Sequence, residues 1–152
     1  MQIGIVGSRK CPELVKSLSL ELGMEIGKLG FTLVNGGLGG VMRYSAMGCK
    51  KKGGTTVGII PGMNRGEGNE FLDAEIVTGI GNLRNGIIVR SSDIVIALGG
   101  GAGTLSEIAL AIDSGKEVLV VEEVNQFPGI EKLGAKILNF DEVLNLLRSL
   151  RK

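Results

Sequence analysis

The sequence predicts an α/β fold in three layers, in which a mainly parallel sheet carries helices on both faces. Short β-branched apolar runs alternate with longer segments of helical periodicity, which is the pattern of βα units. Glycine supplies 26 of the 152 residues and gathers where the apolar runs end, as expected of tight turns between strands and helices. A chain of this length fits one domain, and we expect residues 1–152 to form it.

The first part of the chain predicts three strands and two helices. Residues 2–6 form a short apolar run, which is typical of a strand buried on both faces. Pro12 suits the first turn of a helix that Gly30 ends. The apolar stripe of this helix consists of Leu14, Leu18, Leu22, Ile26 and Leu29. The other elements are a strand over 31–34, a loop over 35–40, a helix over 41–52 and a strand over 55–60.

The second part continues the alternation after a polar, glycine-bearing segment, residues 63–72, which predicts a mobile surface loop. Asp141 is a candidate N-cap for a final amphipathic helix that carries Val143, Leu144, Leu147 and Leu150. Residues 128–133 show no clear pattern. The remaining elements are strands over 74–78, 93–98, 117–121 and 136–138, helices over 83–90 and 104–113, and a glycine loop over 99–103.

Composition excludes several classes of function. The 17 basic and 16 acidic side chains nearly balance, so long-range attraction to nucleic acid or to an anionic membrane is not expected. The absence of His excludes His-based acid–base catalysis and His-ligated metal, and we expect no metal site. Two distant Cys without a secretory leader predict a cytoplasmic protein. No apolar run approaches the roughly 20 residues of a membrane span.

The strongest functional signal is the segment GGGAGTLSE at residues 99–107. It follows a predicted buried strand and opens a helix, so its bare backbone N–H groups and the helix dipole favour an anion. The segment is neither a P-loop nor a clean GxGxxG fingerprint. A tight turn without a ligand is the alternative. The residues predicted to hold a phosphate or another compact oxyanion are Gly100, Gly101, Gly103 and Thr104.

Two earlier loops repeat the design of strand, glycine and helix. Because all these loops follow strands, we expect them to gather at the edge where ligands of doubly wound sheets bind. In the alternative, they are simple turns, with Ser8 as a helix cap and Arg9 in solvent. The candidate residues are Gly7 and Ser8 after the first strand, and Gly36, Gly37, Gly39, Gly40 and Met42 after the second.

Spacing alone leaves the roles of two charged side chains open. Glu107 lies one turn into the helix that follows the glycine loop over 99–103. It either binds ribose hydroxyls or assists catalysis, or it complements the helix dipole. Arg84, beside Asn85, offers a guanidinium for two-pronged binding of a phosphate or carboxylate, whereas spacing alone favours a surface position.

Three motifs in order resemble those of the Lonely Guy-like superfamily of Rossmann-type proteins, also called lysine decarboxylase-like. Residues 99–107 align with its PGGxGTxxE motif, and residues 36–42, GGLGGVM, correspond to its GGGxxGLM motif. The sequence resembles more closely the branch similar to the molybdenum-cofactor carrier protein, which shows GGxGGVM, TGxGxxRN and GGGxGTLSE. Residues 78–85, TGIGNLRN, supply the middle motif.

The resemblance implies a Rossmann-like fold that binds a small phosphorylated ligand at the glycine loops, with Asn85 in the site. The ligand it implies is a nucleoside monophosphate or a molybdenum cofactor of the molybdopterin type, bound by a homodimer or homotetramer. In the hydrolase branch an Arg and the Glu of GTxxE release a base from a nucleoside 5′-monophosphate, and the matching residues here are Arg84 and Glu107. Gly99 replaces the motif's Pro and Asn85 the Lys of an Arg-Lys pair, which favours carrier-like binding. A nucleotide sensor that acts with a partner domain is a third reading.

Overall fold

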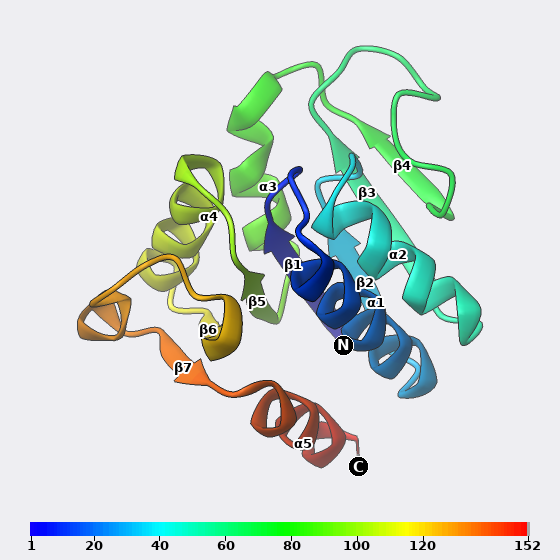
Figure 1. The fold of residues 1–152 in the computed structure, drawn as a ribbon. Coiled ribbons are helices and arrows are strands. Elements are labelled where there is room, and N and C mark those ends of the chain that lie inside the picture. The colour runs from blue at the N-terminus through cyan, green and yellow to red at the C-terminus, as the bar shows by residue number, and fades with distance from the viewer. Residues whose placement is uncertain (152) are drawn as a thin grey trace.

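Seven parallel strands form one sheet in the computed structural model, which describes residues 1–151 (Figure 1). The order across the sheet is β4-β3-β2-β1-β5-β6-β7, so the chain starts in the centre, builds toward one edge, and then returns to build toward the other. The strands are β1 (Gln2–Gly7), β2 (Thr32–Asn35), β3 (Thr55–Ile60), β4 (Ala74–Val77), β5 (Ile94–Leu98), β6 (Glu117–Val121) and β7 (Lys136–Leu138).

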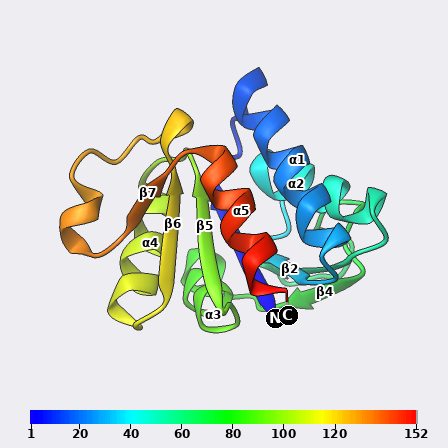
Figure 2. The same cartoon turned by 90° about the horizontal axis from the view of Figure 1, so that it is seen from below.

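Helices cover both faces of the sheet (Figure 2). One face carries α1 (Glu13–Lys28), α2 (Val41–Lys51) and α5 (Phe140–Leu150), and the other carries α3 (Asn85–Arg90) and α4 (Ala102–Asp113). Short 3₁₀ turns lie at Gly81–Arg84, Glu122–Val124 and Ile130–Leu133. None of the helices within residues 1–151 has the length and apolar character that crossing a bilayer requires.

The core follows the two-residue period of the strands. In β5, Ile94, Ile96 and Leu98 pack toward α1 and α5, whereas Val95 and Ala97 pack toward α3 and α4. Both faces of the central strands are covered, which is why they read as continuous apolar runs in the sequence. The prediction of a three-layer, Rossmann-like α/β fold with a parallel sheet is confirmed.

Three local predictions need correction. Leu14 is exposed, and Val15 joins Leu18 in the buried stripe of α1 instead. Repeated steps of four residues drift by roughly 40° each on a helix of 3.6 residues per turn, and this drift carries Leu14 off the stripe. The final helix is capped by Asn139 rather than by Asp141. The predicted helix over 83–90 is a 3₁₀ turn followed by the shorter α3.

The cap at α5 is a reciprocal pair of hydrogen bonds. The Asn139 side chain accepts from the backbone N–H of Glu142 at 2.9 Å, and the Glu142 carboxylate accepts from the backbone N–H of Asn139 at 2.9 Å. This capping box satisfies two N–H groups at once, which a cap at Asp141 would not achieve.

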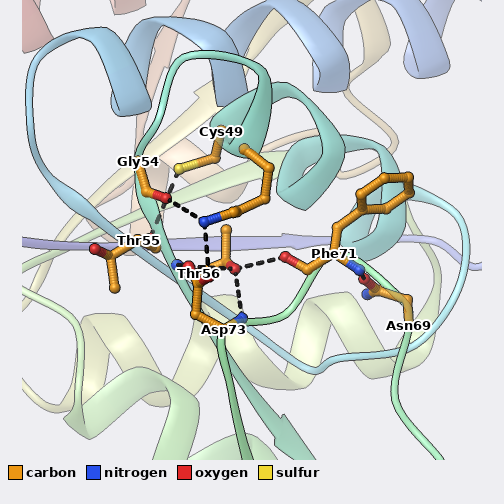
Figure 3. Close-up of polar contacts among 8 residues, drawn as sticks. Cys49, Gly54, Thr55, Thr56, Asn69, Phe71 and Asp73 are labelled. Atoms are coloured by element: carbon orange, nitrogen blue, oxygen red, sulfur yellow. Dashed lines mark hydrogen bonds and ion pairs between the residues drawn. The ribbon is translucent and has the colours of Figure 1, made fainter.

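Polar contacts anchor the surface loop over 63–72 where it returns to the sheet (Figure 3). The Asp73 carboxylate accepts from Lys50 Nζ at 2.6 Å and from the backbone N–H of Thr56 at 2.9 Å. The Thr56 hydroxyl donates to the carbonyl of Phe71 at 2.6 Å. Asn69 Nδ2 donates to the carbonyl of Leu38 at 3.0 Å, so the loop is also tied to the glycine loop after β2.

Glycines let α1 and α2 approach to backbone contact. A Cβ atom at Gly23 of α1 would collide with the carbonyl oxygen of Ser45, and one at Gly48 of α2 would collide with that of Leu20. These obstacles are backbone atoms that no rotamer change can move aside. The two helices therefore pack only with glycine at these positions.

We expect Gly23→Ala to destabilise the protein by about 1–3 kcal/mol, because the added methyl group overpacks a rigid contact. The matched control is Gly86→Ala in α3, where a Cβ atom would meet nothing within 4 Å. The control should stabilise the protein by about 0.5–1 kcal/mol, since Ala restricts the unfolded chain. Urea unfolding measures both, and equal effects of the two substitutions would contradict the packing argument.

Candidate functional site

The glycine loops after β1, β2 and β5 meet at the carboxyl edge of the sheet, as their positions after adjacent strands predict. The order of the strands reverses direction between β1 and β5, and such switch points are where doubly wound sheets bind ligands. A cavity of about 220 Å³ opens there. Its lining consists of Gly7, Ser8, Arg9, Met42, Asn82, Arg84, Asn85, Gly101, Gly103, Thr104 and Glu107.

Five of the glycines that the motifs single out, Gly36, Gly37, Gly39, Gly40 and Gly100, do not line this cavity. Three of them support it from behind. The carbonyl of Gly36 accepts a hydrogen bond from Arg84 Nη2 at 3.3 Å. Side chains at Gly40 and Gly100 would collide with the Ser8 carbonyl and with the Thr104 hydroxyl. The glycine-rich motifs therefore also serve close packing of the loops.

The amino end of α4 presents unpaired backbone donors to the cavity. The helix begins after Gly101, which supplies no side-chain cap. The N–H groups of Ala102, Gly103 and Thr104 donate to no atom of residues 1–151. Together with the positive end of the helix dipole, these amides form an arrangement that suits a phosphate group. Thr104 is 4% exposed and adds a hydroxyl at the same point.

Arg84 is a buried cation that forms no salt bridge with any of residues 1–151. Its side chain lines the cavity, but the residue is only 5% exposed, so the surface position that spacing favours is wrong. Nη1 donates to Asn85 Oδ1 at 2.7 Å, and Nε has no acceptor within the described part of the chain. Burial lowers the pKa of Arg84, while the nearby Glu107 opposes that effect. Because Glu107, with its pKa of about 7, offsets this buried charge only in part, an anion in the cavity would complete the compensation.

Glu107 is also buried, at 8% exposure, and faces the same cavity. Burial raises the pKa of Glu107 to about 7, and the Arg84 guanidinium limits the rise. The carboxyl group is therefore partly protonated near neutral pH. Glu107 lies beyond the first turn of α4, where the helix dipole has faded, so dipole complementation does not account for its position.

A chain of hydrogen bonds joins Arg84 to the first turn of α4. Asn85 accepts from Arg84, and Asn85 Nδ2 donates to Ser106 Oγ at 3.2 Å. Ser106 Oγ donates in turn to the carbonyl of Gly103 at 2.6 Å. The contacts fix the guanidinium relative to the free amides of α4, so the cationic and the backbone donors form one rigid unit.

Sequence reasoning did not predict two of the residues that line the cavity, Arg9 and Asn82. Arg9, which the alternative reading of the first loop places in solvent, is exposed but also borders the cavity and adds positive charge beside Arg84. Its position directly after Gly7-Ser8 was the signal available. Asn82 occupies a variable position of the TGxGxxRN motif, and no pattern in the sequence distinguishes it.

A model of the SLOG cluster4 family matches residues 1–144 of the chain. Two solved structures have similar folds. The molybdenum cofactor binding protein of the phototrophic bacterium Rippkaea orientalis is 35% identical, with a TM-score of 0.89 over 99% of this chain and 97% of its own. The molybdenum cofactor carrier protein of Chlamydomonas reinhardtii is 31% identical, with a TM-score of 0.84 over 98% of this chain and 96% of its own.

Two further relatives are similar in sequence. An uncharacterized protein of Archaeoglobus fulgidus is 48% identical over 118 residues, which are 78% of each chain. Cytokinin riboside 5′-monophosphate phosphoribohydrolase of Mycobacterium tuberculosis is 35% identical over 122 residues, 74% of this chain and 65% of that relative. The matches confirm the resemblance to the Lonely Guy-like superfamily and to its carrier-protein branch.

The raised pKa of Glu107 predicts a stability change with pH. Between pH 4.5 and about 7 the folded state keeps a proton that the unfolded state releases, so stability falls as the pH rises through this window. Glu107→Gln removes this loss, so the free energy of unfolding of the variant should exceed that of the wild-type protein by about 3 kcal/mol at pH 8. Urea unfolding from pH 5 to 8 measures the difference, with the exposed Glu131→Gln as the control. A difference that stays constant over this range would contradict the assignment.

Proposed function

The chain belongs to the SLOG cluster4 family, and on that premise we propose that it binds a small phosphorylated ligand at the carboxyl edge of the sheet as a carrier. The observation that carries this proposal is the buried guanidinium of Arg84, whose Nε has no acceptor among residues 1–151, beside the free amides of α4. Both groups favour an anion, and they share one cavity. A phosphate monoester supplies enough oxygen atoms to meet several of these donors at once.

In this proposal the backbone of Gly101 and Gly103 and the hydroxyl of Thr104 hold the phosphate. Arg84 neutralises its charge from within the protein, and Arg9 does so from the solvent side. Gly7, Ser8, Met42 and Asn85 also line the cavity. The lining is net positive even when Glu107 is ionised, since it holds two arginines, and partial protonation of Glu107 near neutral pH increases the positive charge, which favours the phosphate further.

The molybdenum cofactor is the ligand that the similar structures suggest. The Rippkaea orientalis protein binds it, and the Chlamydomonas reinhardtii protein carries it. We propose that this protein binds the same cofactor through its phosphate, and that a nucleoside monophosphate is the alternative ligand. The residues present fit such a phosphate because they supply backbone donors, a hydroxyl and two guanidinium groups at one edge.

Removal of one anion-binding group should weaken the binding of phosphate. We expect Arg84→Met and Thr104→Val each to lower the affinity for inorganic phosphate or AMP by about tenfold or more, since a hydrogen bond to a charged group contributes about 1.5–3 kcal/mol. Isothermal calorimetry measures the affinity. Arg90→Met, which changes an exposed arginine in the last turn of α3, is the matched control and should bind normally. Equal affinities across all four proteins would refute the site.

A nucleoside monophosphate phosphoribohydrolase is the second candidate, favoured by one observation. Glu107, with its pKa of about 7, lies beside Arg84 in the cavity. In such a reaction water adds to the anomeric carbon, the N-glycosidic bond breaks, and the base leaves with the bonding electrons and takes up a proton. An ionised Glu107 would stabilise the positive charge on the sugar, and a protonated one would supply the proton.

The carrier proposal predicts that no base is released from a panel of nucleoside monophosphates. Chromatography of the reaction mixtures measures free base, and calorimetry on the same samples measures binding. If the wild-type protein releases free base and both Glu107→Gln and Arg84→Met do not, the carrier proposal is wrong and the protein is a hydrolase. The Arg90→Met variant again serves as the control.

We also propose a homodimer, formed through the face that α3 and α4 build together. Large exposed apolar side chains lie on these two helices and on the 3₁₀ turn that precedes α3: Leu83, Ile87, Leu105 and Leu110. Arg84 and Asn85, which line the cavity, belong to the same short stretch of chain as Leu83 and Ile87. A second copy on this face would remove the apolar side chains from water.

Sedimentation at micromolar concentration should detect a homodimer, or a homotetramer if a second face also pairs. Leu83→Glu should yield a monomer, because it places a charge in the apolar interface. Leu14→Glu, at an exposed leucine of α1 on the other face of the sheet, is the control and should leave the assembly intact. A monomeric wild-type protein would contradict the interface.

A further inference from the structure

A second hollow, of about 300 Å³, adjoins the phosphate cavity at Ser8, which lines both. It lies at the carboxyl ends of β5 and β6, beside the amino end of α1. The loop from Gly99 to Gly103 runs along both spaces, with Gly99 and Gly100 in the hollow and Gly101 and Gly103 in the cavity. The two spaces are thus neighbouring parts of one edge of the sheet.

The floor of the hollow is apolar and belongs to the core. Val15, Leu98 and Val124 line it, and all three are members of the apolar cluster between the sheet and α1. No carboxylate or arginine is among the described residues of its lining. Its chemistry is therefore opposite to that of the phosphate cavity, which two arginines and Glu107 surround.

The hollow stays open because its wall lacks side chains. Gly99 and Gly100 have φ values of 63° and 113°, which L-residues rarely adopt. A Cβ atom at Gly99 would lie 3.9 Å from Val15 Cγ2, so a larger residue would begin to fill the space. The rim is polar, since it carries the exposed side chains of Lys10 and Gln126.

We propose that this hollow binds the flat heteroaromatic ring of the ligand whose phosphate occupies the neighbouring cavity; the inference rests on the proposed function. Small-molecule sites combine apolar walls with a few polar groups and usually span about 300–1,000 Å³, more than the phosphate cavity provides alone. The ring lies on Val15 and Val124, above the buried Leu98, and the Gln126 amide meets its polar edge. Ser8 stands where the two parts of the ligand join.

The contacts of Ser8 suit that junction. Its Oγ accepts the backbone N–H of Lys10 at 3.0 Å, which holds the side chain in place. The hydroxyl proton of Ser8 is donated to no atom of residues 1–151 and remains for the segment that links ring and phosphate. The site thus selects ligands that carry both an anion and a ring over either group alone.

Calorimetry with inorganic phosphate, ribose 5-phosphate, AMP and GMP tests this inference. AMP or GMP should bind at least tenfold more tightly than ribose 5-phosphate, because only the nucleotides bring a ring to the hollow. Val124→Phe should fill the hollow and abolish this advantage without changing the affinity for phosphate. Val77→Phe, at the exposed edge strand β4, is the matched control and should retain the advantage.

A second measurement tests the inference even if the Val124→Phe variant does not fold. In the wild-type protein, the methyl NMR signals of Val15 and Val124 should shift on addition of GMP but not of phosphate. If phosphate and ribose 5-phosphate bind, but the ring adds no affinity or leaves these methyl signals unchanged, the inference is overturned and the phosphate site stands. If none of the four compounds binds, both the proposed function and the inference fail.

Discussion

The buried guanidinium of Arg84 is the constraint around which the carboxyl edge of the sheet is organised. A charge with 5% exposure and no salt bridge to any of residues 1–151 is unfavourable unless something compensates it. Its hydrogen-bond acceptors are the neutral Asn85 side chain and Gly36 carbonyl, and the nearby Glu107, whose pKa burial raises to about 7, offsets the charge only in part. The charge of the arginine therefore remains available to an anion. The same low-dielectric surroundings that make the cation unfavourable would strengthen its attraction to a phosphate.

Glycine makes this arrangement possible through packing rather than through flexibility. The loops after β1, β2 and β5 approach one another so closely that side chains at Gly40 or Gly100 would meet backbone or Thr104 atoms. Gly36 lies against Arg84 and leaves room for its head group. The glycine-rich motifs thus set the distance between loops, whereas the donors that face the cavity come from only some of the motif positions.

The difference between a carrier and a hydrolase rests on two neighbouring side chains. Asn85 occupies Arg84 Nη1 and ties it, through Ser106, to the first turn of α4. These hydrogen bonds fix the position of the guanidinium relative to the amino end of α4. Glu107 has the burial and the raised pKa that acid chemistry at neutral pH requires, but the same protonation also improves a site for anions. The same electrostatic arrangement is therefore compatible with a carrier and with a hydrolase. Only cleavage of the glycosidic bond distinguishes the two functions.

The sequence by itself determined the layered fold, the order of nearly all the elements and the edge at which the glycine loops gather, because hydrophobic period and glycine placement are local properties. Its motifs also predicted Arg84, Thr104 and Glu107 as candidate site residues. Only the tertiary structure decided that Arg84 is buried, that Arg9 and Asn82 border the cavity, and that Gly40 and Gly100 pack behind it. Burial and the pairing of charges depend on segments distant in the chain that the sheet brings together, and no spacing within one segment encodes them.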